Sequence, residues 1–144
     1  MSPSTPSIDL TPLSKAIDAL AGALHYWHIE PDDSPRKPHL RAGVIQSFEF
    51  TYELSVRLLR RVLMERAASA PAIADLSFND LLRTAADAAL LSEPLGWRRW
   101  RDLRNRTSHG YDETQAQEIA LAAAAFLEDA RTLLQRLRSA LPTP

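Results

Sequence analysis

The residues of this chain best suited to chemistry stand together in the run RNRTSHGYDE, positions 104–113. Arg104 is permanently cationic, and His109 belongs to the residue type whose ordinary pKa lies nearest neutrality. A phosphate-binding cation together with a base that exchanges protons near pH 7 suits phosphodiester cleavage without a metal. Asn105 can orient the substrate or the histidine. We therefore take Arg104, Asn105 and His109 as candidate catalytic residues.

The spacing of Arg104 and His109 requires a helix that ends between or just after them. Five residues turn a helix by about 500°, so the two side chains would point apart if the helix continued. Gly110 can adopt the left-handed conformation that ends helices, which leaves His109 free to approach Arg104. Asp112 and Gln115 then match the capping box of a new helix. The alternative is a charged helix end that carries a histidine, because cations stabilise helix C-termini.

A candidate basic patch precedes this run, since five arginines stand within nine residues and are offset only by Asp102. The formal net charge is -1, so any contact with nucleic acid has to come from such a local patch rather than from bulk charge. The alternative is a solvated, salt-bridged helix face. The arginines are Arg98, Arg99, Arg101, Arg104 and Arg106, and we expect Arg98, Arg101 and Arg106 to bind substrate.

Glu49 and Glu53 form a second constellation, one helical turn apart. They could act as paired carboxylates, but pairing on the helix surface with Arg57 or Arg60 is the preferred interpretation.

Two further pairs have structural interpretations that we prefer. His25 and His28, with Glu30 beyond, supply too few suitably spaced ligands for a metal, so no metal or cofactor is expected. Trp97 and Trp100 could stack on nucleobases, but their helical spacing favours packing in the core or a dimer.

Composition limits the classes of protein to consider. Of the 144 residues, 45% are hydrophobic and 24% charged, which is typical of a soluble globular domain. There is no cysteine, which excludes disulfides and thiolate chemistry and favours a cytoplasmic protein. The N-terminus lacks the features of a secretory signal, and no apolar run approaches the ~20 residues of a membrane span. We therefore expect no membrane contact.

The pattern of apolar residues predicts long helices separated by proline-marked loops. Thr11 as an N-cap before Pro12 opens a helix to about residue 28, and others follow over about 40–68, from Ser77 to about 89, over about 94–108 and over about 113–141. The helix over 40–68 has two apolar rows, which predicts contact on two sides and, with it, a homodimer. These elements predict an all-α, up-and-down four-helix bundle with one additional short helix. Residues 1–10 are expected to form a flexible arm and 11–141 a single domain.

Two segments resemble motifs of the HEPN superfamily, specifically its HepT toxin branch, also known as nucleotidyltransferase substrate-binding proteins. Arg104, Asn105, His109 and Tyr111 match one motif. The stretch AGVIQSFEFTYEL, positions 42–54, resembles the second helix of that branch. The resemblance covers roughly residues 13–141.

The resemblance implies a HEPN-like homodimer in which two copies of Arg104 and His109 share one cleft. It implies the toxin of a type VII-like toxin–antitoxin pair, a metal-independent endoribonuclease acting on tRNA or mRNA. Its partner would be a minimal nucleotidyltransferase antitoxin that silences the toxin by transferring AMP to Tyr111. The alternative for Tyr111 is an aromatic ring packed over the helix end. For the whole chain, the alternatives are a non-catalytic substrate-binding subunit of a nucleotidyltransferase and a helical interaction module without chemistry.

Overall fold

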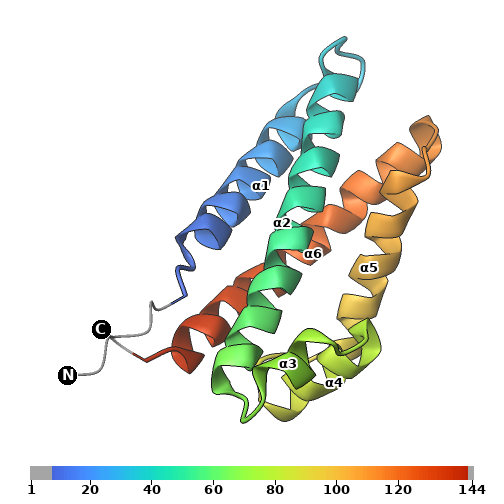
Figure 1. The fold of residues 1–144 in the computed structure, drawn as a ribbon. Coiled ribbons are helices and arrows are strands. Elements are labelled where there is room, and N and C mark those ends of the chain that lie inside the picture. The colour runs from blue at the N-terminus through green and yellow to red at the C-terminus, as the bar shows by residue number, and fades with distance from the viewer. Residues whose placement is uncertain (1–7, 143–144) are drawn as a thin grey trace.

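A computed structural model describes residues 8–142, over which the chain forms six helices and no strand. The helices are α1 (Thr11–Ile29), α2 (Lys37–Arg66), α3 (Ala70–Ala74), α4 (Phe78–Asp87), α5 (Pro94–Ser108) and α6 (Glu113–Ala140). The predicted all-α class is therefore confirmed. The long helices α1, α2, α5 and α6 alternate in direction, while α3 and α4 lie at one end of the bundle between α2 and α5 (Figure 1).

Two short helices occur where the sequence pattern predicted one. The second is α3, which has no buried residue and follows the end of α2 closely. The Arg60 side chain of α2 stabilises it, because Nη1 donates to the carbonyl oxygens of Ile73 and Leu76 at 3.0 and 3.1 Å. Because Arg60 lies on another helix, the five residues of α3 carry no pattern of their own from which this helix could be predicted.

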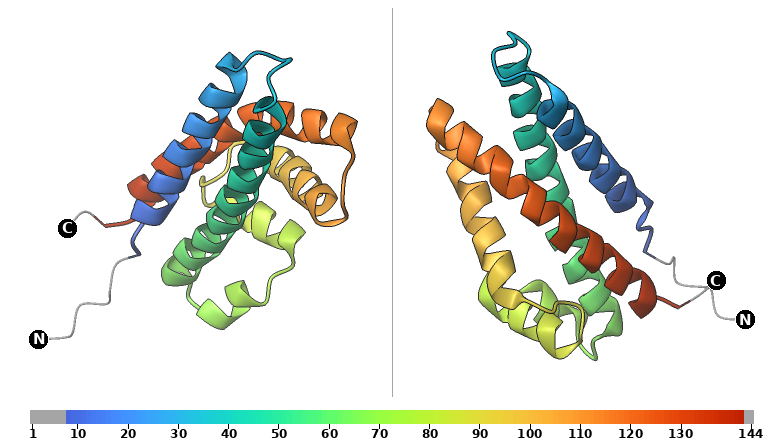
Figure 2. Two further views of the ribbon diagram at one scale, coloured as in Figure 1. Left: turned by 90° about the horizontal axis from the view of Figure 1, so that it is seen from above. Right: turned by 180° about the vertical axis from the view of Figure 1, so that it is seen from behind.

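Helix α2 is covered on two sides, as its two apolar rows predicted. On one side the Thr51 hydroxyl, which donates to the Ser47 carbonyl of its own helix at 2.7 Å, also lies 3.3 Å from the carbonyl oxygen of Ala16 in α1. On the other side Phe48 meets Phe126 of α6. Seen from behind, α6 crosses the bundle (Figure 2). Since α1 and α6 of the same chain cover both rows, these rows give no reason to expect a second copy, and the homodimer stays a prediction that rests on the site alone.

An aromatic cluster forms the centre of the core around Phe126. Its ring packs edge-on against Phe48, Trp97 and Trp100, with centroids 4.9, 5.7 and 5.5 Å apart. Trp97 and Trp100 are both buried, and the indole N–H of Trp100 donates to Asp129 of α6 at 2.7 Å. The preference for packing over base stacking is therefore confirmed for both tryptophans. The cluster fixes α5 against α2 and α6.

The start of α1 differs from the prediction. Leu10 is the N-cap residue rather than Thr11, whose backbone N–H instead bonds to the Asp9 carboxylate at 2.9 Å. Of the arm expected over residues 1–10, residues 1–7 lie outside the described residues. Ile8 and Leu10 are buried against the core, because both are apolar and sit beside the first turn of α1. The packed part of the chain therefore begins before residue 11.

The start of α4 agrees with its capping signal, whereas the end of α4 does not. Ser77 caps α4 by accepting the backbone N–H of Asp80 at 3.2 Å. The predicted extension of α4 to residue 89 is wrong, since Ala89 has a φ of 62° and this left-handed backbone cannot continue the helix. Helix α5 has the predicted bounds, and α2 begins three residues earlier than expected and ends two residues earlier.

Candidate active site at the end of helix α5

Arg104 lies near the end of α5 and is held against α2. Its Nε and Nη2 both donate to Glu53 Oε1, at 3.0 and 2.7 Å. Its Nη1 lies 3.3 Å from Glu49 Oε2 and donates to the Thr107 hydroxyl at 3.0 Å. The side chain is 23% exposed, so it is fixed in place yet still open to solvent along one part. The predicted catalytic cation is therefore oriented by three neighbouring side chains.

These contacts correct the expected partners of the two glutamates. Glu49 and Glu53 do not pair with Arg57 or Arg60 of their own helix but with Arg104 of α5. The i,i+4 rule covers partners on one helix only, whereas Glu53 and Arg104 are 51 positions apart. The sequence does place the two carboxylates one turn apart, and this spacing is what lets both reach one guanidinium.

The end of α5 has the geometry that the sequence predicted. The last helical residue is Ser108, His109 is the C-cap, and Gly110 adopts the left-handed φ of +80°. The hydroxyls of Thr107 and Ser108 donate to the carbonyl oxygens of Arg104 and Asn105, each three residues earlier in the helix, at 2.7 and 2.9 Å. The helix therefore stops one residue before His109.

The predicted capping box of the next helix is also present. Asp112 Oδ1 accepts the backbone N–H of Gln115 at 2.8 Å, and the Gln115 side chain accepts the backbone N–H of Asp112 at 3.0 Å. Both ends of the connection 109–112 are thus fixed by local hydrogen bonds and by one glycine.

Three of the candidate residues are exposed around this connection. Asn105 and His109 are exposed to solvent, and Tyr111 is 39% exposed. Over residues 8–142 no hydrogen bond or ion pair joins His109 to Arg104, so their approach stays a prediction. Tyr111 follows His109 by two residues, and its side chain is partly open to solvent.

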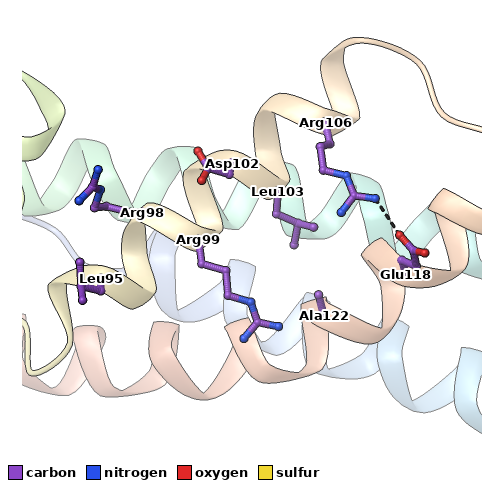
Figure 3. A pocket seen from close by; sticks show the side chains of 8 residues that line it. All are labelled: Leu95, Arg98, Arg99, Asp102, Leu103, Arg106, Glu118 and Ala122. Atoms are coloured by element: carbon purple, nitrogen blue, oxygen red, sulfur yellow. Dashed lines mark hydrogen bonds and ion pairs between the residues drawn. The ribbon is translucent and has the colours of Figure 1, made fainter.

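The five arginines of α5 do not form one basic patch. Arg98, Arg99 and Arg106 line a groove of about 560 Å³ between α5 and α6 (Figure 3), where Arg106 pairs with Glu118 at 2.9 Å. Arg101 lies over the ring of Phe78, 4.8 Å from its centroid, and Arg104 faces α2. Of the residues expected to bind substrate, Arg98 and Arg106 therefore share a surface and Arg101 lies apart from it. Each residue of a helix is rotated by about 100° from the one before it, so these arginines point in different directions and their charges do not gather on one face.

Tyr52 was not recognised from the sequence as part of this region. It is buried in α2 beside Glu53, and burial raises the pKa of its phenol to about 12, since the phenolate would lose its hydration. The positive charges of Arg101 and Arg104 act in the opposite direction. Tyr52 therefore stays protonated at neutral pH and adds no charge to the site.

The site contains no cluster that would hold a metal. In the described part of the chain, no group of three or more histidine, aspartate or glutamate side chains has suitable geometry. His25 and His28, the pair considered from the sequence, are both exposed on α1. Within the arginine and carboxylate cluster, the guanidinium of Arg104 offers a positive charge and hydrogen-bond donors, which are the groups that bind a phosphodiester.

The sequence and the fold agree with one family of helical proteins. Residues 8–139 match the family described as nucleotidyltransferase substrate binding protein like. The chain is 39% identical over 99 residues to a protein of Haemophilus influenzae named probable ribonuclease HepT, which covers 69% of this chain and 68% of that protein. The chain therefore belongs to the HepT-like nucleotidyltransferase substrate-binding family, as the two sequence motifs indicated.

A solved structure has the same fold. It is that of HI0074 from Haemophilus influenzae, described as the fold of a substrate binding domain of a nucleotidyltransferase. The two chains superpose with a TM-score of 0.82 at 33% sequence identity, over 90% of this chain and 99% of the other. No helix between residues 8 and 142 is long and apolar enough to cross a membrane.

Proposed function

We propose that this chain is a metal-independent endoribonuclease, the toxin component of a pair with a minimal nucleotidyltransferase antitoxin. The observation that carries the proposal is the end of α5. There Gly110 stops the helix, so that an exposed histidine follows an arginine whose guanidinium is already oriented. The relative named probable ribonuclease HepT supports the same activity.

In the proposed reaction His109 removes the proton from a ribose 2′-hydroxyl of RNA. The resulting alkoxide attacks the adjacent phosphorus, and the bond to the 5′-oxygen of the next nucleotide breaks. The departing oxygen takes a proton from water, and the protonated His109 gives its proton to the hydroxide that remains. The products are a 2′,3′-cyclic phosphate and a 5′-hydroxyl. Arg104 stabilises the charge that develops on the non-bridging oxygens, and Asn105 orients the substrate or the histidine. Arg98, Arg101 and Arg106 contact the flanking RNA backbone.

One Arg104 and one His109 per chain form a sparse site. We therefore propose a homodimer in which two copies contribute both residues to a shared cleft. The exposed position of His109 and Asn105 at one end of the bundle is compatible with such an arrangement.

Purified protein incubated with tRNA or mRNA in the presence of EDTA tests the activity. We expect fragments that end in 2′,3′-cyclic phosphate, and no cut where a 2′-deoxynucleotide replaces the ribose at the cleavage position. His109→Ala and Arg104→Ala should each abolish cleavage and relieve growth arrest in cells, while Asn105→Ala should weaken both. His25→Ala removes an exposed histidine of α1 and serves as the matched control. Cleavage that persists in His109→Ala would contradict the mechanism.

We further propose that the partner silences this protein by modifying Tyr111. The phenolic oxygen would attack the α-phosphorus of ATP, so that AMP is transferred and pyrophosphate leaves. The added phosphate and base would then compete with RNA for Arg104 by charge and bulk. The 39% exposure of Tyr111 supports access by a second enzyme.

Intact-mass and peptide spectra after co-expression with the partner test this modification. One or more AMP units are expected on Tyr111, and Tyr111→Phe should remain unmodified and toxic. Tyr26→Phe removes a tyrosine that is 61% exposed on α1 and should leave the modification intact. An unmodified Tyr111 in a fully neutralised pair would instead indicate control by complex formation.

A second candidate function is a non-catalytic substrate-binding subunit of a nucleotidyltransferase. One observation favours it: two carboxylates within the single chain already exceed the positive charge of Arg104. This function predicts a stable complex with the partner enzyme and no RNA cleavage by the isolated chain under any of the conditions above.

A further inference from the structure

The contacts of Arg104 differ from those of the other arginines of the chain. Among residues 8–142, Arg104 is the one arginine that lies within ion-pair distance of two carboxylates. Arg106 and Arg131, for comparison, each contact one glutamate, at 2.9 and 2.8 Å. Arg104 also donates to a buried hydroxyl, that of Thr107. This set of contacts goes beyond what a surface ion pair needs.

The contacts fix the guanidinium plane as well as its position. Nε and Nη2 point to one oxygen of Glu53, and Nη1 points to Glu49 and Thr107 on the opposite edge. Contacts on two edges prevent rotation about the last side-chain bonds. One hydrogen of Nη2 has no partner in this set, and the side chain as a whole is 23% exposed.

We call the contacts of Glu53, Glu49 and Thr107 with Arg104 the clamp. The clamp has two opposite effects on the binding of a phosphate. An unrestrained arginine carries about 2 kcal/mol of rotamer entropy, part of which is lost when it orders around a ligand. Here that ordering has already occurred. The two carboxylates and the guanidinium together carry a charge of -1, however, which repels a phosphodiester and weakens its binding.

We infer that Glu53, assisted by Glu49, is a positioning residue that orients Arg104 for the reacting phosphate and lowers the affinity for RNA in doing so. Glu53 makes the shorter contacts, 2.7 and 3.0 Å against 3.3 Å for Glu49, so its contribution is the larger. The inference rests on the proposed ribonuclease activity. It assigns the two glutamates to the function of Arg104 rather than to stability alone.

Glu53→Gln tests the inference because it removes the negative charge and keeps the shape of the side chain. We expect kcat for RNA cleavage to fall on the order of tenfold or more, as misplaced catalytic groups do. The dissociation constant for a 2′-deoxy RNA analogue that cannot be cleaved should decrease, because one negative charge beside Arg104 is removed. Glu49→Gln should show the same pattern with a smaller loss of kcat. Glu128→Gln breaks the Arg131 pair on α6 and should change neither quantity.

Two results would overturn the inference. An unchanged kcat together with a lower melting temperature in Glu53→Gln would show that the contact between Glu53 and Arg104 serves stability only. A rise of kcat together with tighter analogue binding would make Glu53 an inhibitory group that competes with phosphate.

A second readout is independent of catalysis. The Nε–H signal of Arg104 in ¹⁵N NMR spectra should be slow to exchange in the wild type and should exchange rapidly in Glu53→Gln. If the wild type cleaves no RNA, the proposed function fails, while the NMR comparison still decides whether Glu53 holds Arg104. An Nε–H that exchanges equally fast in both proteins would show that Glu53 does not hold Arg104 in place.

Discussion

Gly110 gives the sharpest test of how the local sequence builds this site. Its φ of +80° lies in the region that disfavours every residue with a Cβ, and a Cβ built on it meets no atom within 4 Å. Gly110→Ala therefore adds no steric clash with the rest of the protein, and its cost is the backbone conformation alone. For a non-glycine residue that conformation costs about 1–2 kcal/mol.

Part of this cost is offset in the unfolded chain, because alanine loses less conformational entropy on folding, by about 0.4–1 kcal/mol. The net expectation is a loss of about 1 kcal/mol for Gly110→Ala. With an unfolding entropy of about 2.1 cal/mol/K per residue, the 144 residues convert this to a fall in Tm of about 3 °C.

Gly43 provides a matched control with the opposite sign. It lies in the interior of α2, is exposed, and a Cβ added to it also meets nothing within 4 Å. Gly43→Ala should therefore stabilise the protein by about 0.5–1 kcal/mol through helix propensity. Thermal unfolding of the two variants beside the wild type measures both effects. Equal or higher stability of Gly110→Ala would refute the assignment of the left-handed turn as the helix stop that exposes His109.

Three further predictions follow from the core and the site. Burial raises the pKa of the Tyr52 phenol from its ordinary 10.0 to about 12 in the folded protein. The resulting contribution to the free energy of unfolding is fully present below pH 10 and is lost as the pH rises towards 12. Wild type should thus lose about 2–3 kcal/mol relative to Tyr52→Phe over that interval in urea unfolding, and parallel curves would contradict the buried phenol. Phe126→Ala should cost about 3–5 kcal/mol, because the ring is fully buried among four aromatic side chains, and a loss below about 1.5 kcal/mol would mean that the cluster repacks. Light scattering at micromolar concentrations should give a dimer, and a monomer would count strongly against the shared cleft of Arg104 and His109.

The local part of the site could be predicted from the sequence because capping depends on neighbouring residues. Gly110 ends α5, and Asp112 with Gln115 begins α6, through contacts that span three residues or fewer. The same holds for the start of α4, where Ser77 accepts a backbone N–H three residues on. All the residues that form such a cap lie within a few positions of one another, so the local sequence is sufficient to predict it.

The surroundings of Arg104 could not be predicted in the same way. Its partners lie 51 and 55 positions away on α2, and which side of α2 faces α5 is decided by packing. The prediction of one basic patch was wrong for a simpler reason. Arg98 and Arg104 are six residues apart, a rotation of about 600°, so they point to different neighbours, and counting charges along the chain ignored that rotation.

The rotation of α2 connects the aromatic core to the chemistry of the site. Tyr52 stacks on Trp97 of α5 with centroids 6.4 Å apart, and this contact sets how α2 is turned towards α5. Glu49 and Glu53, three residues before Tyr52 and one after it, then lie at the edge of the buried row and face Arg104. A buried apolar contact thus decides which carboxylates reach the guanidinium. Since the clamp on Arg104 depends on the register between α2 and α5, the residues that orient the proposed catalytic cation belong to two helices, and neither helix alone contains the site.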